Sequence, residues 1–463
     1  MSFDQAPLYD LLIAGGGING AGIARDACGR GLSVALCDKG DFSGATSWAS
    51  SKLIHGGLRY LENREFGLVR ESLKEREVML RIAPHLTRPL RFVLPHDPAA
   101  RRPAWLIRLG LWLYDTLGGR RSLPGSSGVA LGDSAYGAPL KAGYRLGFVY
   151  SDVLVDDARL TLANLQDAAG RGAALLPRTC LVAAVREDGR WRATLETADG
   201  RRQTVFARAI VNACGPWAAR VREDLVGQGR TELQLVRGSH IVVPRLYAGE
   251  HAYTLQNEDG RVCFLIPFHG SHTLIGTTEV KMRDPDVLPE ASAEEIEYLC
   301  RAANRYLRRP IGPADVVWHF AGVRPLLDDG KESAAKMTRE YRFLLDVEDG
   351  APMLTVIGGK LTTYRRLAEK ALATLAPHLP PMGPRWTATA ALPERTIDAG
   401  EPRGRHFGAG LYERDVRYYI DREWAREAED ILWRRTKEGL NMTEQERSAF
   451  AHWLRETRAE PAR

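Results

Sequence analysis

The chain has 463 residues, of which 44% are hydrophobic and 26% are charged, so we expect a globular protein of two or three domains. Its formal net charge of +6 fits an anionic substrate or an anionic membrane surface and gives only weak support to nucleic-acid binding, which we do not expect. The six cysteines include no C-x-x-C pair, which favours reduced thiols in a cytoplasmic protein without a metal site. The sequence has neither a signal-peptide pattern nor a run of about 18 apolar residues that would predict a membrane span.

A glycine-rich turn near the start of the sequence is the most informative motif. An apolar run ends in Gly15, Gly17 and Gly20, spaced G-x-G-x-x-G, and a second apolar run ends at Asp38. Gly15 would permit a sharp turn, Gly17 would let a pyrophosphate approach the backbone, and Gly20 would let a helix pack closely on the strand. The helix N-terminus would offer N–H groups to phosphates, and Asp38 would accept hydrogen bonds from a ribose. This pattern predicts a Rossmann-type dinucleotide site; the alternative is an ordinary tight turn.

The segments after this motif alternate between helical and strand-like patterns. Amphipathic and capped patterns predict helices over 62–83 and 156–170, and apolar runs between turn signals predict strands at 174–176, 180–185, 191–196 and 204–206. Further along, we expect a buried strand in 209–217, a mixed sheet over 231–330 with a helix near 293–307, a strand at 353–357 followed by a helix, and a helical tail from about 402. Nucleotide-binding segments therefore flank an inserted sheet.

Several strings together resemble one family. The chain resembles the FAD-dependent, quinone-linked glycerol-3-phosphate dehydrogenases, the aerobic bacterial and mitochondrial type, from about residue 9 to 393 and again from about 408. The strings that carry this resemblance are residues 15–22, 50–62, 238–241, 322–325 and 358–365. One departure is a C-terminal helical domain that is shorter than in other members.

The resemblance implies an α/β fold in six segments. An FAD-binding domain of the glutathione-reductase-like and amino-acid-oxidase-like type is expected from the segments 8–90, 151–225 and 351–392. A mixed-sheet substrate domain would occupy 226–350, with a membrane-facing or substrate-side insertion at 91–150. Residues 402–463 would form a small α-helical cap.

The same resemblance implies that the chain oxidises sn-glycerol 3-phosphate to dihydroxyacetone phosphate by hydride transfer to N5 of FAD. His240 is the candidate base because imidazole titrates near neutral pH; the alternative is a packed histidine. Arg324 follows a strand-like run and precedes Pro325, which would fix a turn there. Its side chain would bind a developing alkoxide or the phosphate, unless it forms a structural ion pair. Lys360, at the start of a helix, would add positive charge near the flavin or the substrate, unless it is ordinary helix N-terminal chemistry.

Further residues follow from the matched strings. Arg59, Tyr60 and Arg339 are candidates to hold the phosphate, although an isolated arginine is more often a surface residue. The cofactor-binding candidates are Gly15, Gly17, Ile18, Asn19, Gly20, Asp38, Thr46, Ser47, Ser51, Lys52, Leu53, His55, Gly215, Gly359, Leu361 and Thr362.

Apolar and aromatic residues flanked by arginines over 101–121 predict either an interfacial helix or a buried helix with arginines at its ends. We expect a peripheral protein on the inner, anionic face of the cytoplasmic membrane that passes electrons to ubiquinone or menaquinone and forms a homodimer. The alternatives are a soluble glycerol-phosphate oxidase that uses oxygen, a related amine or amino-acid oxidase, and a flavin-binding membrane scaffold without turnover.

Overall fold

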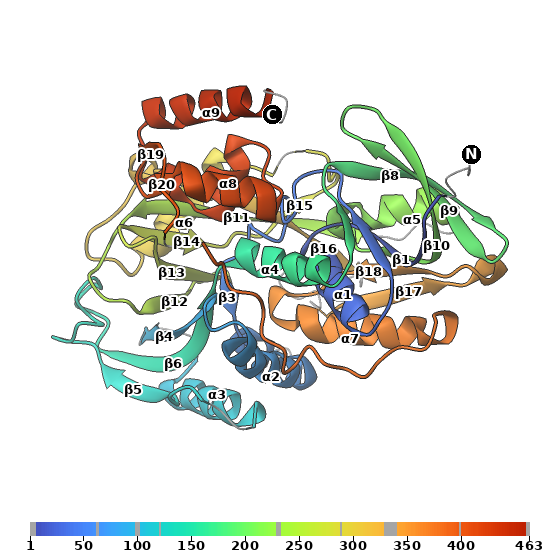
Figure 1. Ribbon diagram of the computed structural model, residues 1–463. Coiled ribbons are helices and arrows are strands. Elements are labelled where there is room, and N and C mark those ends of the chain that lie inside the picture. The colour runs from blue at the N-terminus through green and yellow to red at the C-terminus, as the bar shows by residue number, and fades with distance from the viewer. Residues whose placement is uncertain are drawn as a thin grey trace.

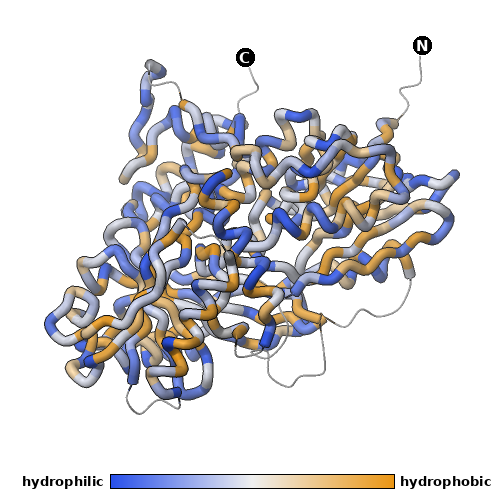
Figure 2. The backbone as a smooth tube through the Cα atoms, turned by 90° about the horizontal axis from the view of Figure 1, so that it is seen from below, coloured by the Kyte–Doolittle hydropathy of each residue, from blue (hydrophilic) through white to orange (hydrophobic). Residues whose placement is uncertain are grey.

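The computed structural model describes residues 6–61, 64–97, 102–119, 122–227, 233–287, 289–327, 340–397 and 400–459. Two large sheets lie side by side, and a helical cap from the end of the chain lies at the upper left of Figure 1, above the sheet that contains β11 (Leu233–Pro244) and β14 (His272–Gly276). Hydrophobic residues run along the strands of the sheets in Figure 2. Within the described residues, no helix combines the length and the apolar character that crossing a membrane requires.

The first sheet is a doubly covered, mainly parallel sheet. Its strands follow the order β17 (Arg342–Asp346), β18 (Met353–Ile357), β10 (Arg202–Asn212), β1 (Leu8–Ala14), β2 (Val34–Cys37) and β7 (Ala174–Leu176), with the antiparallel pair β8 (Thr179–Glu187) and β9 (Arg190–Thr197) joined to β10. Alternate residues of β1 face opposite sides of the sheet: Leu11 and Ile13 pack beneath helices, whereas Leu12 packs toward Trp191. The covering helices are α1 (Ile18–Gly29), α4 (Asp157–Gly170) and α7 (Tyr364–Leu375).

The second sheet is mixed and carries helices on both faces. Leu299 of α6 packs on one face, and Leu73 of α2 with Leu111 of α3 packs on the other. The helices are α2 (Phe66–Ile82), α3 (Ala104–Leu117) and α6 (Ala293–Asn304). The strands follow the order β15 (Val280–Met282), β11 (Leu233–Pro244), β14 (His272–Gly276), β13 (Val262–Phe268), β12 (Ala252–Gln256), β4 (Thr87–His96), β6 (Leu146–Val155) and β3 (Leu53–Ile54), with β16 (Trp318–Leu327) beside β11 and β5 (Ser127–Ala130) beside β6.

The cap has its own core, which includes Phe407, Tyr419, Ile431 and Phe450. It comprises β19 (His406–Gly408), β20 (Leu411–Tyr412), α8 (Glu413–Glu423), the π-helix η8 (Asp430–Arg435), η9 (Glu438–Leu440) and α9 (Glu444–Ala459). The remaining elements are α5 (Ala218–Val226) and the short turns η1 (Leu58–Leu61), η2 (Gly215–Trp217), η3 (Pro313–Asp315), η5 (Glu348–Gly350), η6 (Leu361–Thr363) and η7 (Ala376–His378).

Strand pairing places several boundaries differently from the sequence prediction. β17 pairs with β18 in the nucleotide sheet, although it falls within the segment 226–350 assigned to the substrate domain. β4 and β6 pair with each other in the second sheet across the expected boundaries at 90/91 and 150/151. These differences arise because pairing between distant segments, and not local pattern, decides to which sheet a strand belongs.

Helix α3 exposes apolar side chains over much of its surface. The exposed fractions are 67% for Trp105, 55% for Trp112 and 44% for Leu109, whereas Leu111 and Tyr114 are buried. The alternative of a wholly buried helix is therefore wrong, because one face of α3 packs on the second sheet while the other presents large apolar groups to the outside.

Candidate active site

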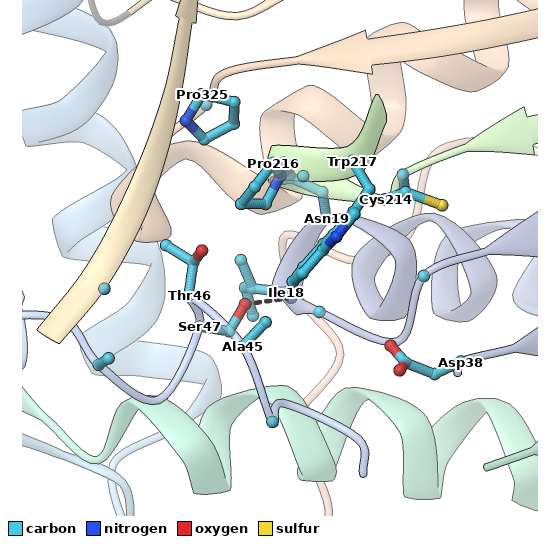
Figure 3. A pocket seen from close by; sticks show the side chains of 18 of the residues that line it. Ile18, Asn19, Asp38, Ala45, Thr46, Ser47, Cys214, Pro216, Trp217 and Pro325 are labelled. Atoms are coloured by element: carbon cyan, nitrogen blue, oxygen red, sulfur yellow. Dashed lines mark hydrogen bonds between the residues drawn. The ribbon is translucent and has the colours of Figure 1, made fainter. Parts of the chain in front are cut away.

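A cavity of about 740 Å³ lies between the two sheets. The carboxyl ends of the parallel strands β1, β2, β10 and β18 open into it, which is where open α/β sheets bind their ligands. Residues of β11 and β16 from the second sheet close the other side. Figure 3 shows Ile18, Asp38, Thr46, Trp217 and Pro325, which reach this cavity from separate segments.

Backbone geometry explains the glycines of the first turn. Gly15 has a φ of +108°, a conformation that L side chains rarely adopt. A Cβ on Gly20 would overlap with the carbonyl oxygen of Gly15, so that the close packing of α1 against the turn requires glycine. These observations agree with the roles expected for the two residues.

Three N–H groups of the turn donate within the protein, and that of Gly15 donates to Cys37 O at 2.8 Å. The backbone N–H of Gly16 donates to Asp38 Oδ2 at 2.7 Å. That of Ile18 donates to Ser47 Oγ at 2.9 Å, the bond drawn in Figure 3. Asp38 also accepts from the N–H of Gly40 at 2.8 Å. Burial raises the pKa of Asp38, and the backbone donors of Gly16 and Gly40 oppose that shift. The N–H groups at the N-terminus of α1 were expected to be offered to phosphates, but that of Ile18 donates to Ser47 instead.

His240 lies just behind the cavity wall. It is 2% exposed, its ring stacks on Phe320 with centroids 5.0 Å apart, and its Nε2 lies 2.8 Å from Ser51 Oγ. Its Nδ1 has no hydrogen-bond partner among the described residues. Burial, followed by the positive charges of Arg324 and Lys52, holds the pKa of His240 well below its ordinary value. The imidazole is therefore neutral near pH 7, and Ser51 is the lining residue that it contacts.

Two cationic side chains line the cavity where the sheets meet. Lys360 Nζ lies 3.6 Å from the centroid of the Tyr60 ring, a cation–π geometry, and Tyr60 also lines the cavity. Arg324 NH2 lies 3.4 Å from Thr277 Oγ1, which it contacts as a donor. Arg324 lies within β16, which continues through Pro325 to Leu327; the prediction of a turn at Pro325 is wrong. The cavity therefore has positive charge from both sheets.

The cavity brings together most of the residues selected from the sequence. Among the candidates whose side chains the structure describes, three do not line it. Gly20 packs inside α1, His240 lies behind Ser51, and Lys52 Nζ donates to Asp157 Oδ1 at 2.9 Å and to Trp48 O at 2.8 Å. The candidates that line the cavity are Gly15, Gly17, Ile18, Asn19, Asp38, Thr46, Ser47, Ser51, Leu53, His55, Tyr60, Gly215, Arg324, Gly359, Lys360, Leu361 and Thr362.

Two predicted substrate residues are not placed as side chains. Arg339 lies outside the described residues, and only the backbone of Arg59 is described, within η1. The roles suggested for both stay predictions.

Sequence reasoning missed part of the wall near Asp38. Asp41, Arg178 and Arg434 line the cavity together with Trp217 and Arg220. Arg434 belongs to the cap and lies nearly four hundred positions beyond Asp41 in the sequence, so no local pattern marks it. Asp41 follows the expected ribose acceptor by three residues, which is the one sequence signal that was available.

Comparisons with known proteins agree with this geometry. Residues 10–365 match the family described as FAD dependent oxidoreductase. This chain belongs to the FAD-dependent oxidoreductase family. It is 47% identical to the glycerol-3-phosphate dehydrogenase of Pseudomonas aeruginosa, over 97% of this chain and 95% of the relative. It is also 47% identical to the D-erythritol 1-phosphate dehydrogenase of Brucella abortus, over 96% of this chain and 97% of the relative.

The fold of this oxidoreductase also resembles that of a solved structure. The glycerol-3-phosphate dehydrogenase from Bacillus halodurans complexed with FAD matches with a TM-score of 0.71 and 25% sequence identity, covering 98% of this chain and 95% of that chain. The alignment with the Pseudomonas relative spans 492 positions, more than the 463 residues of this chain, so the relative contains residues that this oxidoreductase lacks. The shorter C-terminal domain stays a prediction.

The lining of the cavity fits FAD, the cofactor of the family. Asn19 Nδ2 donates to Gly358 O at 3.1 Å, while its buried Oδ1 has no partner among the described residues and can accept from a ligand hydroxyl. His55 N donates to Thr362 Oγ1 at 3.3 Å, which joins two segments of the wall. The turn 15–19 and Asp38 would hold the diphosphate and ribose, and the segments 46–55 and 358–362 would hold the ring.

Proposed function

We propose that this FAD-dependent oxidoreductase oxidises sn-glycerol 3-phosphate to dihydroxyacetone phosphate. The observation that carries the proposal is the pair of cations, Arg324 and Lys360, on a cavity wall shared by the two sheets. A phosphate dianion and a developing alkoxide both require such groups, and arginine offers a planar fork of donors. Tyr60 is the third contact of this phosphate site, and Arg59 and Arg339 are proposed to complete it.

The proton of the substrate alcohol needs an acceptor. When bound, FAD supplies the acceptor for the hydride that leaves C2. Ser51 Oγ accepts the alcohol proton and passes its own proton to Nε2 of the neutral His240, since the two atoms lie 2.8 Å apart. Burial keeps His240 neutral near pH 7, so that its Nε2 is available as the acceptor.

The base role is tested by two substitutions. His240→Ala should slow flavin reduction by about 10²- to 10⁴-fold, with a much smaller change in substrate binding, and Ser51→Ala should slow it comparably. Stopped-flow bleaching of the flavin measures both variants. Slow flavin reduction in His240→Ala with a normal rate in Ser51→Ala would mean that His240 contacts the substrate directly. Normal rates in both variants would mean that neither residue acts as the base.

D-erythritol 1-phosphate is the second candidate substrate. The relative with that name is as similar to this chain as the glycerol-3-phosphate dehydrogenase of Pseudomonas aeruginosa, at 47% identity. Both compounds are polyol phosphates, so the same cationic wall would serve either one. The length of the polyol, and not the phosphate, would distinguish them.

The exposed apolar face of α3 supports a peripheral membrane location and a quinone acceptor. Trp105 and Trp112 would lie at the boundary of an anionic membrane on its inner face. Tyr114 on the opposite face of α3 accepts from the backbone N–H of Gly56 at 2.7 Å, next to His55 in the cavity wall. Ubiquinone or menaquinone would thus be reduced near the membrane. A homodimer stays a prediction.

Anaerobic bleaching of the bound flavin tests the proposed reaction. Glycerol 3-phosphate should bleach the yellow protein at substrate concentrations where glycerol and amino acids do not, and D-erythritol 1-phosphate is compared directly. Rapid reoxidation by a ubiquinone analogue and slow reoxidation by oxygen would support the dehydrogenase over the oxidase. Bleaching by an amino acid alone, or by none of these compounds, would overturn the proposal in favour of an amino-acid oxidase or a scaffold.

A further inference from the structure

Buried ion pairs join the C-terminal cap to the loop after β2. Asp41, which is 6% exposed, accepts from Arg434 Nε at 2.9 Å and from Arg435 NH2 at 2.8 Å. Arg435 NH2 also donates to the backbone carbonyl of Glu423 in α8, at 2.7 Å. Two arginines of the cap therefore meet on a single carboxylate of the nucleotide domain.

The same loop rests on the cap through a second contact. The ring of Phe42 packs edge-on against Trp424, with centroids 5.3 Å apart. Arg178, which follows β7, donates from its backbone N–H to Gly40 O at 2.9 Å and from NH2 to Asp430 Oδ2 of the cap at 2.8 Å. The loop 38–44 is thus fixed to the cap at its centre and through its neighbour at residue 178.

The cap also contacts the start of α4. Lys437 Nζ lies 3.0 Å from both carboxylate oxygens of Asp156, and Arg159 NH2 lies 2.7 Å from Glu423 Oε1. The adjacent Asp157 accepts from Ser50 Oγ at 2.7 Å, and Ser50 lines the cavity. Asp157, which holds Ser50 of the cavity wall, therefore directly follows Asp156, which forms an ion pair with the cap.

These contacts all converge on the wall of the FAD cavity. Asp38, Gly40, Asp41 and Gly44 of the loop line it, and so does Arg434 from the cap. Removing one partner of a buried ion pair leaves an uncompensated charge, so the loop and the cap are stable in this arrangement only together. We infer that docking of the cap and binding of FAD are thermodynamically coupled, with Arg434 and Arg435 as positioning residues for loop 38–44.

Coupling of this kind is reciprocal. If the docked cap strengthens FAD binding by a given factor, bound FAD stabilises the docked cap by the same factor. A cap that served only to cover the surface would lack this reciprocity, because its stability would be the same with and without FAD. The inference needs no particular substrate, so a failed substrate test would leave it intact.

Arg434→Gln tests the inference through the affinity for FAD. Apoprotein titrated with FAD, followed by flavin fluorescence and visible circular dichroism, should bind FAD roughly 5- to 150-fold more weakly in the variant, and Arg434→Lys should restore part of the loss. The matched control is Arg417→Gln, since Arg417 pairs with Glu413 inside the cap at 2.7 Å and is exposed. The control should bind FAD as the wild type does. Equal affinity in all variants would overturn the inference.

The wild-type protein supplies a test that depends on no variant. Hydrogen exchange over residues 413–435 is measured in the apoprotein and after saturation with FAD. Exchange in this segment should slow when FAD is bound, by a factor comparable with the loss of FAD affinity in Arg434→Gln. Identical exchange in the two states would overturn the inference, even if Arg434→Gln proved too unstable to titrate.

Discussion

The two sides of the cavity are built in different ways. On the nucleotide side, backbone groups of Gly16 and Ile18 donate to Asp38 and Ser47, and all four residues come from one stretch of about thirty. On the substrate side, Ser51, Arg324 and Lys360 reach the cavity from separate segments through their side chains, and Ser51 contacts His240 from β11. The glycine turn of the first side is encoded locally, whereas the second side exists only after two sheets have packed together.

The largest expected effect is on the backbone-built side. Gly20→Ala places a Cβ against the carbonyl oxygen of Gly15, whose own N–H donates to Cys37 O at 2.8 Å and cannot shift freely. We expect loss of bound flavin and a decrease of about 1–3 kcal/mol in the free energy of unfolding. Flavin content after purification and urea denaturation of the apoprotein measure these two effects.

Gly110→Ala is the matched control for this substitution. No atom outside the backbone of α3 itself and the neighbouring residues lies within 4 Å of the position that its Cβ would take. The flavin content should therefore stay normal, and helix propensity should raise stability by up to about 1 kcal/mol. If Gly20→Ala kept its flavin, the backbone of the turn would not be the element that shapes the nucleotide side.

The difference between the two sides also decides what the sequence could predict. The G-x-G-x-x-G turn and Asp38 were found because their spacing is local, and α4 was found because Asp156 caps it, accepting from Arg159 N at 3.1 Å. The pairing of Asp41 with Arg435 left no local pattern, since 394 positions separate the two residues.

Pro325 shows why local rules fail on the substrate side. Proline after Arg324 predicted a turn, yet β16 continues through it. β16 pairs only with β11 among the described strands, and an edge strand tolerates the missing N–H of proline. Edge position is a property of the assembled sheet, so the sequence could not supply it. The roles of Arg324 and Lys360 were likewise suggested by family resemblance and not by spacing.

A moderate effect is expected on the side built by side chains. His240 must be neutral to accept a proton, and its pKa is lowered by burial and then by Arg324, so the acid limb of the kcat/KM profile should lie below pH 6.5 in the wild type. Arg324→Gln removes a positive charge, raises the pKa of His240, and should move the acid limb to higher pH besides weakening turnover.

The pH dependence of kcat/KM between pH 5 and 8, from steady-state assays with an artificial dye acceptor, measures this shift. His240→Ala serves as the comparison, because a profile governed by His240 should lose its acid limb when the imidazole is absent. An acid limb at the same pH in the wild type and in Arg324→Gln would mean that the charge of Arg324 does not lower the pKa of His240.

The smallest effect on the cavity is expected from the outer face of α3. Trp105→Ser with Trp112→Ser should change stability by no more than about 0.5 kcal/mol for each substitution, because the two side chains are 67% and 55% exposed. Dye-linked activity should stay normal, while cosedimentation with anionic vesicles should be lost. Tyr114→Phe on the inner face should have the opposite effects. Cosedimentation with vesicles should persist, whereas dye-linked activity should fall, because the backbone N–H of Gly56 loses its acceptor beside the cavity. Unchanged cosedimentation of the double variant would assign the exposed tryptophans to some contact other than a membrane.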